Sequence, residues 1–146
     1  MDRITLANNY HDNGFNCAQS VFAAFGDLTG IDEKTALMVA GGFGGGVKVG
    51  EICGAASGAV MVIGALYPHV TEKDMAEKKL VGDVTTEFLK RFKERFGTLP
   101  CRDLKLIKIS PEMAPAATAH GINKHCAVLI AEAVAILEEL LEELKK

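Results

Sequence analysis

Residues 41–64 read GGFGGGVKVGEICGAASGAVMVIG, which places nine glycines and one cysteine in twenty-four positions. Soluble domains on average contain roughly one glycine in fourteen residues. Glycine is used where a backbone must turn sharply or approach another group closely. The stretch therefore predicts a loop followed by a helix, with another helix, a ligand or a second sulfur lying against the region of Cys53.

The residues that follow the glycine loop, 53–67, are almost wholly apolar and end before Pro68, which indicates a buried central helix. Helical spacing of apolar residues dominates the rest of the chain, and no run alternates as a half-buried strand does. The sequence thus predicts an all-α fold, a compact single-domain helical bundle over residues 1–146 with a buried central glycine-rich helix. The other helices are expected to start at or near Asp2, Asn16, Asp32, Thr71, Thr98 and Asn123.

Two long amphipathic helices carry apolar residues about four positions apart. In the first, which Gly97 should terminate, they are Leu80, Val84, Phe88, Phe92 and Phe96; in the last, they are Leu129, Ala133, Leu137, Leu140 and Leu144. Exposed parts of such rows often pair across a two-fold axis. We therefore expect a homo-oligomer.

The composition narrows the function classes. The net charge is −3 and no basic cluster is present, which argues against a nucleic-acid partner. The most apolar stretch, Ile52 to Tyr67, is shorter than the roughly 20 residues of a membrane span. Because the N-terminal residues lack the features of a secretory signal, a cytoplasmic protein is expected.

Four cysteines carry the strongest chemical signal. Cys17, Cys53, Cys101 and Cys126 are 36, 48 and 25 positions apart, so no CxxC pair or zinc-finger spacing is present. Structural disulfides are rare in the cytosol, which favours redox chemistry or metal binding, although free cysteine also fills cores. Any shared site must be assembled by the fold.

Each cysteine is predicted to lie in or near the first turn of a helix. Unpaired amides and the helix dipole stabilise a thiolate there and can lower the cysteine pKa from about 8.5 to between roughly 3.5 and 7.5. Lys124 and His125 next to Cys126 act in the same direction. All four cysteines are therefore candidate catalytic residues. We expect Cys53 to be the reactive thiolate, and the next candidate is Cys126.

The pattern of Cys17, then CGAASG at 53–58, then Cys101 and Cys126 resembles the C-GCAxxG-C-C family of putative redox-active proteins. The flanking segments NCAQSVFAAF and GGFGGGVKVGEICGA are also similar to that family, although this chain has the order Cys53-Gly54-Ala55. The resemblance implies redox activity, without a substrate, and marks the four cysteines together with Gly54, Ala55 and Gly58.

Gly54 and Gly58 are four residues apart and share one helix face with Ala55 close by. Such small residues allow another backbone to approach closely. The face is explained either by tight helix packing or by a second cysteine or a ligand lying against Cys53. For this reason Gly54, Ala55 and Gly58 are also candidate cofactor-binding residues.

Three functions remain open. The first is a thiol redox protein, a possible thiol–disulfide oxidoreductase, that acts by dithiol–disulfide or electron-transfer chemistry on an unknown small-molecule or protein partner. The second is a metal site in which Cys17, Cys53, Cys101 and Cys126 hold an iron–sulfur cluster or zinc. The third is a non-catalytic helical scaffold with buried cysteines. We expect the GGFGGG segment to be a flexible loop over the thiols rather than a nucleotide-binding loop.

Overall fold

The computed structural model describes residues 1–145 and confirms the all-α prediction. Its longer helices, in chain order, are α1 (Arg3–Asp12), α2 (Cys17–Ala24), α4 (Glu33–Ala40), α5 (Gly54–Leu66), α6 (Met75–Phe96) and α9 (His125–Leu144). Shorter segments connect them: α3 (Gly26–Thr29), the irregular turn η1 (Gly46–Gly50), α7 (Cys101–Leu104), the 3-10 turn η2 (Pro111–Met113) and α8 (Pro115–Ala119). Among the described residues, the structure contains no helix long and apolar enough to span a membrane.

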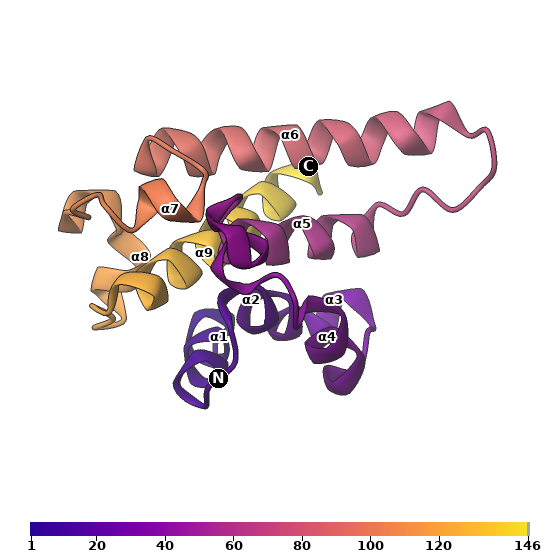
Figure 1. Ribbon diagram of the computed structural model, residues 1–146. Coiled ribbons are helices and arrows are strands. Elements are labelled where there is room, and N and C mark those ends of the chain that lie inside the picture. The colour runs from indigo at the N-terminus through magenta and orange to yellow at the C-terminus, as the bar shows by residue number, and fades with distance from the viewer. Residues whose placement is uncertain (146) are drawn as a thin grey trace.

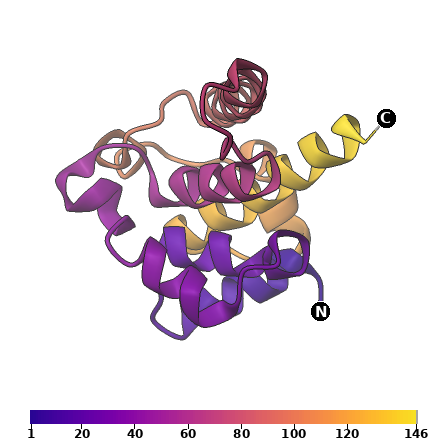
Figure 2. The same cartoon turned by 90° about the vertical axis from the view of Figure 1, so that its right-hand side faces the viewer.

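The helices form layers around α5 and α9. Figures 1 and 2 show α6 on one side of this central pair and helices α1 to α4 on the other. Both α5 and α9 contact α2 and α6, so the two central helices are covered on opposite sides. The core contains Phe25 from α2's C-terminal end, Ile63 from α5, Phe88 and Phe92 from α6, and Leu137 from α9. The buried position predicted for the glycine-rich helix is confirmed.

Side-chain caps explain where several helices begin. Asp2, Asn16 and Asp32 each accept a hydrogen bond from a backbone amide three residues later, which confirms the caps predicted at Asn16 and Asp32. Asp74 rather than Thr71 caps α6, because the Asp74 carboxylate accepts from the Glu77 amide. The last helix begins near Asn123, as predicted, but the predicted Asn123 cap is wrong, since α9 begins at His125 without a side-chain cap.

The predicted apolar rows are buried except at their outer ends. Leu80 on α6 is 49 % exposed and Leu144 on α9 is 46 % exposed, because both lie beyond the region where these helices pack on the core. One charged side chain is buried in α9. The Glu132 carboxylate pairs with Arg95 of α6 and accepts the Ala117 amide at 2.7 Å, which ties α6 and α8 to α9.

Candidate functional site

A short backbone pairing brings the start of α5 to the start of α7. Ile52 and Pro100 form an antiparallel bridge, flanked by a hydrogen bond from the Cys53 amide to the Leu99 carbonyl at 2.9 Å. The Cys101 amide donates to the Glu51 carbonyl at 2.6 Å on the other side of the bridge. Two cysteines that are far apart in sequence therefore begin neighbouring helices.

The small residues of α5 bring Cys17 to the same place. A Cβ atom added to Gly54 would lie 3.1 Å from the Cβ of Cys17, and one added to Gly58 would lie 2.6 Å from the carbonyl oxygen of Ala18. Real Cβ atoms essentially never come as close as the second distance, so α2 and α5 can meet only because glycine occupies these positions. The prediction that these small residues serve close helix packing is confirmed.

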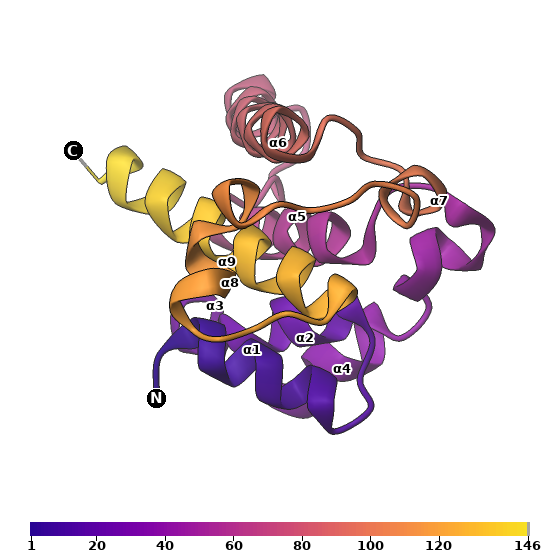
Figure 3. The same ribbon diagram turned by 90° about the vertical axis from the view of Figure 1, so that its left-hand side faces the viewer.

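The start of α9 completes the site. The His125 Nε2 atom lies 2.7 Å from the Leu104 carbonyl oxygen, so the imidazole, as donor, joins α9 to the end of α7. Figure 3 shows the start of α9 beside the loop that leads from α1 into α2. Cys126, the second residue of α9, consequently lies beside Cys17, the first residue of α2, and each affects the protonation of the other.

All four cysteines thus gather where four helices begin. Cys17 and Cys101 are the first residues of their helices, Cys53 is the residue before α5, and Cys126 is the second residue of α9. Their predicted placement at helix starts is confirmed. The thiols lie close enough for each to act electrostatically on the protonation of others in the cluster.

Cys17 and Cys126 form a thiol–thiolate pair. A hydrogen bond from the Cys17 thiol is the main reason that the Cys126 pKa falls from 9.0 to about 6, and the positive charges of His11, His125 and Lys105 act in the same direction against the effect of burial. The same hydrogen bond, together with burial, raises the pKa of Cys17. These opposite pKa shifts favour the arrangement in which Cys17 keeps the proton and Cys126 is the thiolate.

Cys53 behaves in the opposite way. Burial raises its pKa to about 11 and outweighs the amides of Ala55 and Ala56, which stabilise its thiolate. The thiol is only 2 % exposed. This argues against the expectation that Cys53 is the reactive thiolate: the helix-start amides act as expected, but the desolvation of a thiolate in the core is the larger effect. The lowered pKa belongs instead to Cys126, which is partly exposed.

Sequence comparison places the chain in a family. A family model described as "Putative redox-active protein (C_GCAxxG_C_C)" matches residues 15–140, which include all four cysteines. The chain belongs to the C-GCAxxG-C-C family. No curated protein and no solved structure matched the chain.

The glycines of the C-GCAxxG-C-C signature contact protein atoms in this structure. Gly54 lies against Cys17 and Gly58 against the α2 backbone, while Ala55 is fully buried. This face of α5 is filled by α2, so we assign no cofactor contact to these three residues. The sequence alternative that a second cysteine lies against the region of Cys53 agrees with the position of Cys17.

The glycine-rich loop is held by side-chain and backbone contacts close to the cysteines. A Cβ atom at Gly44 would lie 2.7 Å from the Cβ of Asn16, and the Asn16 Nδ2 atom donates to the Gly41 carbonyl at 3.0 Å. Val47 and Lys48 in η1 have positive φ angles of 57° and 64°, which side-chain-bearing residues rarely adopt. The loop therefore packs against the residue that caps α2, directly before Cys17.

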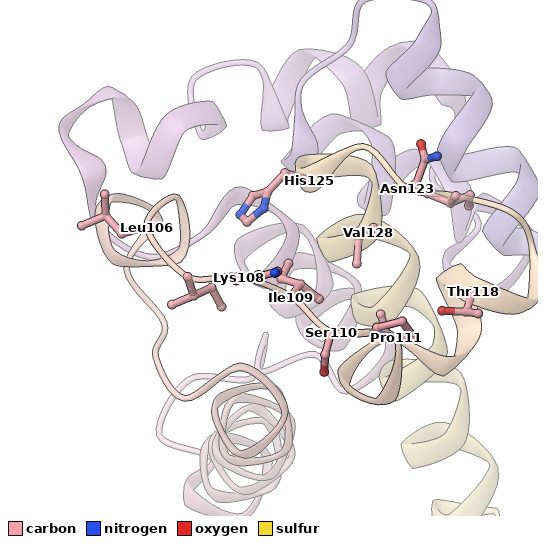
Figure 4. Close-up of a pocket in the computed structure, with 12 residues that line it drawn as sticks. Leu106, Lys108, Ile109, Ser110, Pro111, Thr118, Asn123, His125 and Val128 are labelled. Atoms are coloured by element: carbon pink, nitrogen blue, oxygen red, sulfur yellow. The ribbon is translucent and has the colours of Figure 1, made fainter.

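A cavity adjoins the site on the far side of His125. It has a volume of about 460 Å³, and its lining includes Lys108, Asn123, His125 and Val128. Figure 4 shows the His125 imidazole at the start of α9, facing the segment that carries Lys108 and Ile109. His125 therefore lines this cavity and also lowers the pKa of the neighbouring Cys126.

Two residues near Cys126 had no distinguishing signal in the sequence. His11 lies at the end of α1, more than one hundred positions away, and its buried Nδ1 atom lacks a hydrogen-bond partner. Lys105 immediately follows α7. Only the packing of α1 and α7 around α9 shows that both favour the Cys126 thiolate.

The four-cysteine metal site remains a prediction from the sequence. In residues 1–145, no three side chains of His, Cys, Asp or Glu are arranged to hold a metal ion. We derive no chemistry through a metal or a cluster.

Proposed function

We propose that this member of the C-GCAxxG-C-C family is a cytoplasmic thiol–disulfide oxidoreductase in which Cys126 attacks a substrate disulfide and Cys17 resolves the product. The observation that carries the proposal is that the first residue of α2, Cys17, lies beside the partly exposed Cys126 of α9, whose pKa is lowered to about 6. The family description supports redox activity.

The first step is a disulfide exchange. The Cys126 thiolate attacks one sulfur of the substrate, an S–S bond forms to Cys126, the substrate S–S bond breaks, and one substrate thiolate leaves. At neutral pH the thiolate is the predominant form of Cys126, so no separate base is required. The partial exposure of Cys126 allows a substrate to reach it.

The second step uses the thiol that already contacts Cys126. Cys17 loses its proton, attacks the Cys126 sulfur and forms a Cys17–Cys126 disulfide, and the second substrate thiolate leaves and takes up a proton. The protein loses two electrons and the substrate disulfide gains two. A small dithiol can reduce the protein again by the reverse exchange.

The proposal is tested by product stoichiometry with an aromatic disulfide probe, 5,5′-dithiobis(2-nitrobenzoate), added at one equivalent to the reduced protein. Wild type should release both probe thiolates in a rapid phase. Cys17→Ser should release one and retain the other, and Cys126→Ser should lose the rapid phase. The double variant Cys17→Ser, Cys126→Ser is the matched control. A rapid phase that survives in Cys126→Ser would contradict the proposal.

A further inference from the structure

Cys53 lies next to Cys17 but out of reach of the solvent. Only 2 % of Cys53 is exposed. The residue after it, Gly54, approaches Cys17 so closely that a Cβ atom there would lie 3.1 Å from the Cys17 Cβ. An outside disulfide therefore has poor access to Cys53, whereas Cys17 packs against the next residue and is close enough to Cys53 for the two thiols to act on each other electrostatically.

We infer that Cys53 is an internal acceptor that takes the disulfide over from the Cys17–Cys126 pair. The inference rests on the proposed function, which supplies the first disulfide. In this step the Cys53 sulfur attacks the Cys17 sulfur, a Cys17–Cys53 bond forms, the Cys17–Cys126 bond breaks, and Cys126 leaves as the thiolate.

The step is balanced without another oxidant or reductant. One disulfide replaces another, and the only species released is the proton of the Cys53 thiol. The amides of Ala55 and Ala56 stabilise the attacking Cys53 thiolate as it forms.

The chemistry of the leaving group sets the direction of the exchange. A thiol of low pKa leaves a disulfide faster than one of high pKa. Attack on Cys17 releases Cys126, which His11, His125 and Lys105 stabilise as a thiolate. After the exchange the disulfide joins Cys17 to the buried Cys53, and the partly exposed Cys126 is a thiolate again.

Time-resolved mapping of disulfides tests the inference, because trypsin places each cysteine in a separate peptide: residues 4–34, 49–73, 96–102 and 125–145. The reduced full-length protein is treated with one equivalent of the aromatic probe, quenched with acid at successive times, alkylated and analysed by mass spectrometry. In wild type the Cys17–Cys126 link should appear first and then give way to Cys17–Cys53, while Cys126 becomes alkylatable again. In Cys53→Ser the Cys17–Cys126 link should persist.

The possible results separate the inference from the proposed function. A wild-type Cys17–Cys126 link that persists while Cys53 remains a free thiol overturns the relay and leaves the proposed function intact. A disulfide that moves to Cys101 instead also overturns it. If the Cys17–Cys126 link is absent at early times in both wild type and Cys53→Ser, the proposed function fails as well. The wild-type time course decides the question even if Cys53→Ser does not fold.

Discussion

Removal of the hydrogen bond from Cys17 should make Cys126 an ordinary thiol. The Cys126 pKa of about 6 lies well below its usual 9.0, and the Cys17 hydrogen bond is the largest cause. At pH 7 a thiol with a pKa of about 6 is roughly nine-tenths thiolate, whereas one with a pKa of 9 is only about one-hundredth thiolate. In Cys17→Ala the groups His11, His125 and Lys105 remain. We therefore expect the pKa of Cys126 to rise by at least about one unit without returning fully to 9.0.

The assay is alkylation by iodoacetamide between pH 4.5 and 9.5, followed on the peptide of residues 125–145. The midpoint of the rate profile should lie near pH 6 in wild type and above pH 7 in Cys17→Ala. Cys17→Ser is the matched control, because its hydroxyl retains a donor and should shift the midpoint less. An unchanged midpoint in Cys17→Ala, or a wild-type midpoint near 9, would refute the assignment of the thiolate to Cys126.

Four further outcomes are expected. Alkylation of Cys53 should be much slower than that of the partly exposed Cys126 in native protein and become comparable only in denaturant, which site-resolved mass spectrometry measures. Gly58→Ala should lower the free energy of unfolding by about 1–3 kcal/mol through overpacking against α2, whereas Gly64→Ala, which has open space around it, should raise it by up to about 1 kcal/mol; urea denaturation checks both. Glu132→Ala should lower the free energy of unfolding by at least about 1–3 kcal/mol, because it leaves the buried Ala117 amide of α8 without its acceptor. A decrease below about 0.5 kcal/mol, the size expected of a surface substitution, would contradict this. Sedimentation at micromolar concentration should show a homo-oligomer, and Leu80→Asp should shift it toward the monomer. A monomeric wild type would contradict this prediction.

Much of the fold could be predicted because its signals are local. Asp2, Asn16 and Asp32 cap the helices that follow them, and Gly97 ends α6. Beyond the helix start expected at Cys101, residues 99–121 could not be assigned, since α7, η2 and α8 are too short to show a period. Their positions depend on contacts with distant segments, such as the bridge between Ile52 and Pro100.

The candidate site could be predicted in its members but not in their roles. Helix starts mark all four cysteines from local sequence, and the small residues of α5 predict a close neighbour. The order of thiol reactivity, however, depends on burial and on charges from other helices. Burial raises the pKa of Cys53, whereas Cys17 and His11, which only the assembled fold brings close to Cys126, lower the pKa of Cys126.

The most direct measurement of the central claim is the site of the mixed disulfide that forms in Cys17→Ser. The variant is treated with one equivalent of the aromatic probe at pH 7, quenched with acid and digested, and the mass of each cysteine peptide is determined. The account predicts that the probe thiol is attached to the peptide of residues 125–145, at Cys126, and that reduction removes it. Attachment chiefly to the Cys53 or Cys101 peptide, with the Cys126 peptide unmodified, would contradict it.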